Sequence, residues 1–291
     1  MTGIEWTDRT WNPATGCDKV SPGCKNCYAE ALANRLQRMG NPRYRNGFDV
    51  TLHHDKLREP HGWAQGAWVF VNSMSDMLHA DIPDAFLLEA FRTMRGTPRH
   101  RYQVLTKRPE RWASVTEMVV RELGAFPQNV LPGASIENRE VIDGTRKIAP
   151  RLKALAKAGD DGTVRMISGE PLLGSLVPEG GTVADLAAEL SEARIGWFIT
   201  GGESAFPSKY RPSDLRWFEE VRDACAIAGI PFFHKQHGGP GVTKAHKRGG
   251  EHATLDGVLH HAMPTVFGHG AAPAKLGLFA DKLAAAQDAL Q

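Results

Sequence analysis

The stretch AWVFVNSMSDMLHADIPDAFLLEAFRTMRGTPRHRYQVLT, residues 67–106, predicts the fold most directly. Residues 67–73 and 101–106 are short and apolar, which is typical of buried strands. Residues 82–96 between them have the apolar spacing of a helix. Two strands joined by a helix pair in parallel, because the helix returns the chain to the same end of the sheet. We therefore predict a βαβ unit here.

The same alternation continues along the chain. Further strand patterns lie at 129–135, 163–168, 195–200 and 230–235. Helical patterns lie at 141–159, 183–193 and 213–230, the last with Ser213 or Asp214 as a candidate N-cap and Gly229 as a candidate end. Six such strands predict an α/β protein with a partial or full (βα) TIM-like barrel. A doubly wound open sheet is the alternative.

The length and composition agree with one barrel. The chain has 291 residues, and a typical α/β barrel takes roughly 250. We expect a barrel domain over residues 1–265 and a peripheral, alanine-rich C-terminal helix or tail over residues 266–291. The chain has neither the ~18 consecutive apolar residues of a membrane span nor the layout of a secretory signal. We therefore expect a cytoplasmic protein with no membrane partner.

The net charge of +2 indicates no particular partner, but one stretch is strongly basic. Eight cationic or titratable side chains fall between residues 92 and 111: Arg92, Arg95, Arg99, His100, Arg101, Lys107, Arg108 and Arg111. They form either a solvated basic face or a surface that attracts phosphate or another anion.

Functional residues are expected at the carboxyl ends of the predicted strands, in a barrel and in a doubly wound sheet alike. Nearly every predicted strand ends in polar, charged or glycine residues. These are Asn72, Ser73, Ser75, Asp76, Thr106, Lys107, Arg108, Ser135, Glu137, Asn138, Ser168, Glu170, Thr200, Gly201, Gly202, Glu203, Ser204, Lys235 and Gln236. The repetition favours a functional site at this edge over a set of ordinary loop residues.

Three cysteines stand close together in GCDKVSPGCKNCYAE, residues 16–30, while Cys225 is far away in a helical pattern and is expected to be a core residue. A reducing cytosol disfavours disulfides, so a local group of thiols indicates metal binding or redox chemistry. Three thiolates from one loop suit three irons of a [4Fe–4S] cluster and leave the fourth iron open. A structural zinc site would need a fourth ligand, from Cys225 or from His53, His54, His61 or His79. Reduced thiols without a metal are the third alternative.

The stretch TWNPATGCDKVSPGCKNCYAE resembles a phage-associated three-cysteine family related to the radical S-adenosylmethionine (SAM) superfamily. The resemblance continues through VNSMSDMLHADIP, QVLTKRPERW, GASIEN, ISGEPLLG, ITGGES, IPFFHKQHGG, LDG and MP, and so covers about residues 5–265. Two features differ from the usual superfamily pattern. Six residues separate the first two cysteines in place of three, and residues 72–76 replace a glycine-rich motif.

The resemblance implies a partial TIM barrel with an N-terminal iron–sulfur cluster loop. Cys17, Cys24 and Cys27 would ligate a [4Fe–4S] cluster, and SAM would chelate the open iron. One electron, from a donor such as flavodoxin or ferredoxin, would cleave SAM to methionine and a 5′-deoxyadenosyl radical. That radical would abstract hydrogen from the substrate, while the barrel excludes water.

The positions of the strand ends then suggest a role for each candidate residue. For SAM we expect Ser73, Ser75 and Asp76 at the amino group, Lys107 or Arg108 at the carboxylate, Ser135, Glu137 and Asn138 at the ribose, and Gly201 and Gly202 at the adenine. Tyr28 is expected to pack against the cluster or the adenine. The candidates for substrate contact and catalysis are Lys107, Glu170, Glu203, Lys235 and Gln236. An ion pair between Lys107 and Glu203 across the barrel mouth is the competing interpretation for those two.

The expected substrate is a modified nucleobase or nucleotide in phage DNA, acted on in the host cytoplasm by isomerase-type or lyase chemistry. Repair of a DNA photoproduct is the alternative enzymatic reaction, and modification of a peptide fits the sequence less well. A binding protein stabilised by zinc or by an unreactive cluster is the alternative from another class. Residues 204–212 and 237–252 are candidate mobile covers for the site.

Overall fold

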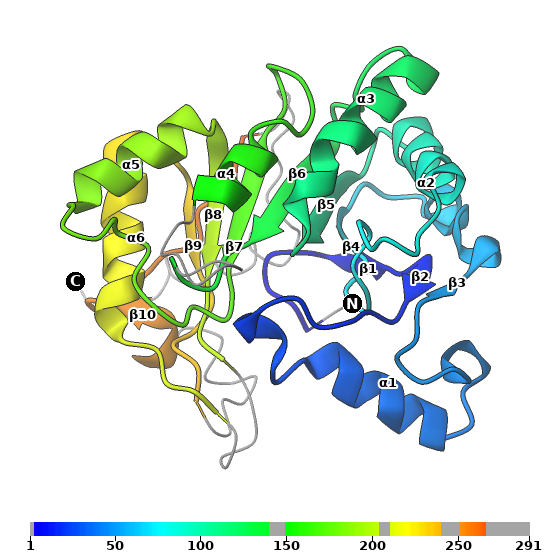
Figure 1. The fold of residues 1–291 in the computed structure, drawn as a ribbon, viewed down its shortest axis with the longest axis horizontal. Coiled ribbons are helices and arrows are strands. Elements are labelled where there is room, and N and C mark those ends of the chain that lie inside the picture. The colour runs from blue at the N-terminus through cyan, green and yellow to red at the C-terminus, as the bar shows by residue number, and fades with distance from the viewer. Residues whose placement is uncertain (1–2, 140–148, 204–209, 240–250, 266–291) are drawn as a thin grey trace.

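The computed structural model describes residues 3–139, 149–203, 210–239 and 251–265. Its centre is a seven-stranded parallel sheet in the order β1-β4-β5-β6-β7-β8-β9, curled into a half-barrel (Figure 1). The strands are β1 (Arg9–Trp11), β4 (Trp68–Val71), β5 (Arg101–Thr106), β6 (Val130–Ser135), β7 (Arg165–Gly169), β8 (Ile195–Thr200) and β9 (Phe232–His234). Each new strand joins the previous one on the same side, as in a TIM barrel, which excludes a doubly wound order.

Five helices connect successive strands and lie around the outside of the sheet (Figure 1). They are α2 (Asp84–Gly96), α3 (Trp112–Leu123), α4 (Ala149–Leu155), α5 (Val183–Glu192) and α6 (Leu215–Ala228). The remaining helix of the described residues, α1 (Tyr28–Arg38), lies apart from this layer, after the cysteine loop. The fold is therefore the predicted partial (βα) barrel.

Short elements complete the described residues. Two small antiparallel pairs are β2 (Ala14–Thr15) with β3 (Thr51–Leu52), and β10 (Thr254–Leu255) with β11 (Val258–Leu259). The 3₁₀ helices are η1 (Pro22–Cys24), η2 (Pro42–Tyr44), η3 (His54–Lys56), η4 (Glu59–Gly62), η5 (Pro109–Arg111) and η6 (Glu251–Ala253).

The sequence predictions of the six strands and of the helices at 82–96, 183–193 and 213–230 are confirmed, whereas α3 was not predicted. All six predicted strands exist, and β5 has the predicted bounds. Asp214 is the N-cap of α6, where its side chain accepts a hydrogen bond from the Arg216 backbone N–H at 2.9 Å. Gly229 ends the same helix at φ +67°. Cys225 is fully buried in the core, as expected.

The strands alternate between two apolar layers. Residues such as Val69 and Val104 face outward and pack against the helices. The other face carries a separate, mainly aromatic cluster: Trp6, Trp68, Phe70, Leu131, Met166, Trp197, Ile199 and Phe233. Trp6 comes from the N-terminal segment and packs on Phe70 with a ring-centroid distance of 4.8 Å. The inside of the half-barrel is therefore packed with side chains at depth.

The basic stretch does not form one face. Arg99 and Arg101 lie at the amino end of β5, where Arg99 donates to the carbonyl oxygens of Trp63 at 2.8 Å and His61 at 2.9 Å. His100 is fully buried. Lys107 and Arg108 follow the opposite end of the same strand, and Arg111 pairs with Asp84. The cations of this stretch are divided between the two ends of β5.

Three expectations fall wholly or partly outside the described residues. These are the C-terminal tail at 266–291, and most of the candidate covers at 204–212 and 237–252. The first part of the predicted helix at 141–159 also lies outside them. Within the described residues, no helix combines the length and the apolar character that crossing a membrane requires.

Candidate functional site

A cavity of about 410 Å³ opens at the carboxyl edge of the sheet. The period-two alternation of the strands explains most of its polar lining. Because side chains alternate along a strand, the next inward side chain lies two residues beyond an inward-facing core residue. Asn72 follows Phe70 in this way, and Lys107 follows Leu105. The polar residues so placed are Asn72, Lys107, Ser168 and Lys235, and Ser135 lies two such steps beyond Leu131. Below them, Ile4, Trp6, Phe70 and Leu105 form an apolar floor.

The cysteine loop covers one side of this cavity. Cys17 follows β2, Cys24 ends η1, and Cys27 is the N-cap of α1. Gly16 makes the turn into the loop at φ +88°, and a Cβ there would lie 2.2 Å from the Asp49 carbonyl oxygen. Only glycine fits that approach. The turn thus delivers the first cysteine to the edge of the sheet.

Half-buried Cys17, Cys24 and Cys27 all line the cavity. No histidine of the described residues lines it with them, and Cys225 lies in the core of α6. Three soft thiol donors beside an open cavity fit a [4Fe–4S] cluster with three protein ligands and one free iron position. A closed structural zinc site of the Cys₄ or Cys₃His type would require a fourth cysteine or a histidine, and the described lining includes neither.

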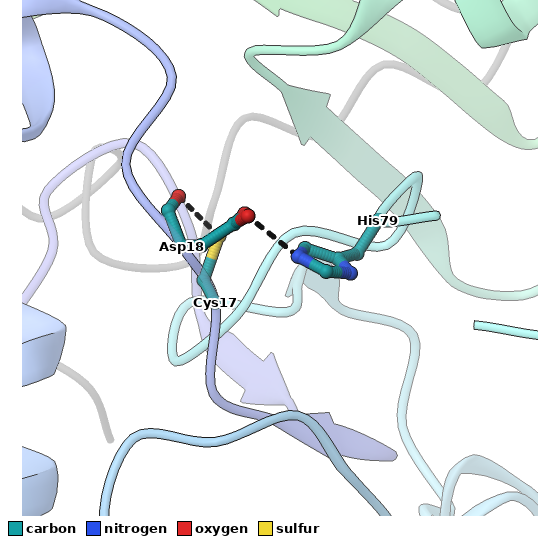
Figure 2. A group of neighbouring side chains, drawn as sticks. All are labelled: Cys17, Asp18 and His79. Atoms are coloured by element: carbon teal, nitrogen blue, oxygen red, sulfur yellow. Dashed lines mark hydrogen bonds and ion pairs between the residues drawn. The ribbon is translucent and has the colours of Figure 1, made fainter. Parts of the chain in front are cut away.

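Cys17 also belongs to a polar group outside the cavity lining. Its sulfur, a carboxylate oxygen of Asp18 and a ring nitrogen of His79 lie within 4.8 Å of one another (Figure 2). His79 Nε2 lies 2.7 Å from Asp18 Oδ1, and Nδ1 accepts from the Asp81 backbone N–H at 3.1 Å, so Nε2 carries the proton donated to Asp18. Arg108 Nη1 lies 3.4 Å from Cys17 Sγ and opposes a metal cation among these three groups.

The electrostatics of this group reflect burial and the nearby cation. Burial raises the pKa of the Cys17 thiol to about 11, although the hydrogen bond from Arg108 acts in the opposite direction. Desolvation would also raise the pKa of Asp18. The hydrogen bond from His79 and the charge of Arg108 outweigh it, and the Asp18 pKa lies below its usual value.

Glu137 ties the middle of the cysteine loop to the sheet. It is buried and accepts hydrogen bonds from Ser21 Oγ and from Arg151 Nη1, the latter at 2.8 Å. Lys107 Nζ lies 3.8 Å from the same carboxylate. Gly23 passes so close that a Cβ would lie 2.3 Å from Glu137 Oε1. The structure gives Glu137 an anchoring position beside the cavity lining.

Glu203 ties the same loop to the end of β8. It accepts hydrogen bonds from Asn26 Nδ2 at 2.9 Å and from Arg211 Nε at 3.0 Å, and Arg211 Nη1 also donates to the Pro22 carbonyl oxygen at 2.9 Å. Burial alone would raise the Glu203 pKa, but these hydrogen bonds hold it below its usual value. The competing interpretation of an ion pair between Lys107 and Glu203 is wrong, because each pairs elsewhere.

The structure brings most predicted site residues to the cavity. Its lining includes Cys17, Cys24, Cys27, Tyr28, Ser73, Ser75, Asp76, Lys107, Ser135, Glu170, Gly202, Glu203 and Lys235. Five predicted residues are not part of the lining: Arg108, Glu137, Asn138, Gly201 and Gln236. Among these, Arg108 and Glu137 contact the cysteine loop, and Gln236 Nε2 donates to the Gly202 carbonyl oxygen at 2.8 Å.

Some lining residues already have partners that limit what they can bind. Asp76 Oδ1 accepts from Thr106 Oγ1 at 2.6 Å, and Oδ2 accepts from the Lys107 backbone N–H at 3.0 Å. Ser75 Oγ donates to the Ala14 carbonyl oxygen at 2.9 Å. Lys235 and Glu170 form an ion pair. Asp76 and Ser75 therefore act first as supports for the strand end and the cysteine loop.

Among the lining residues without a predicted role, Trp6 was missed altogether, and Asn72 was expected at this edge but given no role. Trp6 left no signal in the sequence, because nothing near it predicts that the N-terminal segment enters the barrel. Asn72 did leave one, since asparagine at a strand end is suited to a left-handed turn. Its φ is +56°, and its buried Oδ1 accepts no hydrogen bond within the described part of the chain.

Comparisons with known proteins give a family and several structures. A family model described as "Protein of unknown function (DUF5131)" matches residues 1–264. No curated protein matches the chain. A mutant of spore photoproduct lyase is similar at 17% identity and a TM-score of 0.45, covering 66% of this chain and 55% of that one. The lyase complexed with dinucleoside spore photoproduct has 16% identity and a TM-score of 0.45, covering 74% and 59%. This chain therefore spans little more than half the length of these structures.

Proposed function

The chain belongs to the DUF5131 family of proteins of unknown function, and we propose that it is a radical SAM enzyme. The observation that carries the proposal is the position of Cys17, Cys24 and Cys27. All three belong to one short loop and line one cavity at the carboxyl edge of a parallel half-barrel. In such barrels this edge is where chemistry takes place. The three cysteines would hold the [4Fe–4S] cluster and leave one iron open.

When bound, the cluster and SAM supply a 5′-deoxyadenosyl radical that abstracts hydrogen. The apolar floor made by Trp6, Phe70 and Leu105 excludes water from the inner end of the cavity. Lys107 is the better placed of the two proposed cations for the SAM carboxylate, since it lines the cavity and Arg108 does not. Ser135 is our proposed ribose contact, because it faces the same space.

The SAM amino group is proposed to bind at residues 72–76, since this segment lines the cavity and Asn72 Oδ1 accepts no hydrogen bond from the described residues. Ser73 and Ser75 shape this segment, with Ser73 Oγ donating to Asn12 Oδ1 at 3.2 Å. Tyr28 donates its hydroxyl proton to the Ser73 carbonyl oxygen, and the residue is 57% exposed. It can therefore contact a ligand as the cavity fills.

For the substrate we propose a nucleobase or nucleotide, modified by isomerase-type or lyase chemistry. Support comes from Lys235, a second cation of the cavity lining besides the one proposed for SAM, which suits an anionic group of the substrate. The Glu170–Lys235 ion pair lies where substrate would meet the barrel, and either partner can hold or move a proton. Photoproduct repair remains the second reaction. A one-electron donor such as flavodoxin or ferredoxin, a cytoplasmic location and a phage origin also remain proposals.

The test is anaerobic reconstitution with iron and sulfide, followed by dithionite and SAM, with 5′-deoxyadenosine measured by mass spectrometry. We expect the product from the wild type and from Cys225→Ala, and none from Cys24→Ala. Iron uptake without 5′-deoxyadenosine, with and without added oligonucleotide, would contradict SAM cleavage. One zinc per chain and no cluster would favour the metal-stabilised binding protein. An oligonucleotide that carries a photoproduct distinguishes repair from modification by its product masses.

A further inference from the structure

Arg108 lies beside the first cysteine at the carboxyl end of β5. Its Nη1 is 3.4 Å from Cys17 Sγ, a distance that suits an N–H···S hydrogen bond. Its side chain is only 10% exposed. Because Arg108 is not part of the cavity lining, its contact with the sulfur leaves the cavity side of that sulfur open.

Two carboxylates fix the guanidinium in this position. Asp76 Oδ2 lies 3.3 Å from Nη1, and Asp18 Oδ1 accepts a hydrogen bond from Nη2. Asp76 is itself held by Thr106 Oγ1 at 2.6 Å, and Asp18 by His79 Nε2 at 2.7 Å. The cation is thus held from both sides, and its charge is compensated without the thiol. Cys24, by contrast, has the neutral hydroxyl of Ser21 at 3.7 Å.

We infer that Arg108 is a positioning residue that orients Cys17 and favours the reduced state of the cluster it ligates. The inference rests on the proposed function. Reduction adds one electron, supplied by an external reductant, and breaks no bond. The added negative charge is shared by the sulfur ligands, so a fixed N–H donor with a hydrogen bond to one of them stabilises the reduced state more than the oxidised state. Hydrogen bonds to the sulfurs are an established influence on cluster potentials.

The test compares the wild type with Arg108→Gln, Arg108→Lys and the control Arg139→Gln after reconstitution. Arg139 is also mostly buried, with a side chain 12% exposed, but pairs with Glu189 at 2.6 Å and is outside the cavity lining. Iron per chain and the midpoint potential, followed by electron paramagnetic resonance during dithionite titration, are the readouts. We expect the midpoint potential of Arg108→Gln to be lower than that of the wild type by at least 59 mV, which corresponds to a tenfold change in the one-electron redox equilibrium. The midpoint potential of Arg108→Lys should fall less, and that of Arg139→Gln should equal the wild-type value.

The outcomes separate the inference from the proposed function. A wild type that takes up no cluster would overturn the proposed function, and this inference with it. Clusters in the wild type and in Arg108→Gln with equal potentials would overturn the inference alone. If Arg108→Gln takes up no iron, Arg108→Lys decides. A lower potential in that variant supports the role of the guanidinium, and an unchanged potential overturns it.

Discussion

Gly23→Ala tests the way in which the cysteine loop is seated. A Cβ at this position would lie 2.3 Å from Glu137 Oε1 and 2.4 Å from its Cγ, whereas ordinary contact begins at 3.4 Å. Either the loop or the carboxylate must move. The carboxylate is held by Arg151 at 2.8 Å, and both side chains are almost fully buried, at 3% and 4% exposed. We therefore expect the more exposed loop to move.

The two responses differ in magnitude. Overpacking that the loop absorbs costs about 1–3 kcal/mol in the free energy of unfolding. Displacing Glu137 from Arg151 would break a buried ion pair and cost about 3–5 kcal/mol. Because we expect the loop to move, the smaller cost should apply. It should be accompanied by a clear loss of iron per chain, since Cys24 directly follows the altered residue.

Urea unfolding of the apo protein and iron analysis after reconstitution measure the two effects. Gly62→Ala is the matched control, because a Cβ at Gly62 meets nothing within 4 Å. Equal urea midpoints and equal iron contents for the two variants would show that Glu137 does not hold the loop in the way described.

Three further changes are expected to have measurable effects. His234 is fully buried, and burial lowers its pKa well below 6.5, so the unfolded chain gains a proton below pH 6.5 that the folded chain does not. As the pH is lowered below 6.5, the free energy of unfolding should therefore decrease, by up to about 1.4 kcal/mol per pH unit from this group. Urea unfolding measured at several pH values should show a smaller decrease for His234→Gln than for the wild type. Arg211→Ala removes the cation that pairs with Glu203, so we expect the free energy of unfolding, measured by thermal unfolding, to decrease by about 1.5–3 kcal/mol. A chelator should also remove iron faster from this variant than from the wild type. An unchanged rate of iron removal would count against the anchoring of the cysteine loop by Glu203. Cys225→Ser should lower the free energy of unfolding, measured in urea, by about 1–3 kcal/mol, which is more than Cys225→Ala should. Both variants should keep the iron content of the wild type, and a loss of iron would implicate this thiol as a ligand.

The sequence predicted the strands because their signal is local. Each strand segment, such as RYQVLT, is short and apolar and is followed by polar residues. The helices between the segments indicate that the strands pair in parallel. The same reasoning placed Lys107, Ser135 and Lys235 at one edge. The three cysteines were equally visible, because their spacing in an otherwise cysteine-poor chain does not depend on the rest of the fold.

The roles of Arg108, Glu137 and Glu203 could not be predicted in the same way. Each was expected to contact a ligand, yet each bonds to the cysteine loop across a large separation in sequence. Side-chain partners of this kind depend on which strands become neighbours and on which face each residue occupies. Trp6 is a similar case, since its place on the cavity floor depends on the path of the N-terminal segment.

The inward-facing polar positions have a consequence for how such a protein can diversify. Asn72, Lys107, Ser135, Ser168 and Lys235 lie in or just after different strands, and the residues before three of them, Val71, Ala134 and Ile167, pack in the outer apolar layer. A substitution at one of the serines or lysines changes the cavity and leaves the packing between strand and helix intact, whereas Asn72 is also required by its turn at φ +56°. Ligand preference can therefore evolve, or be redesigned, one position at a time, without drawing on the stability of the scaffold.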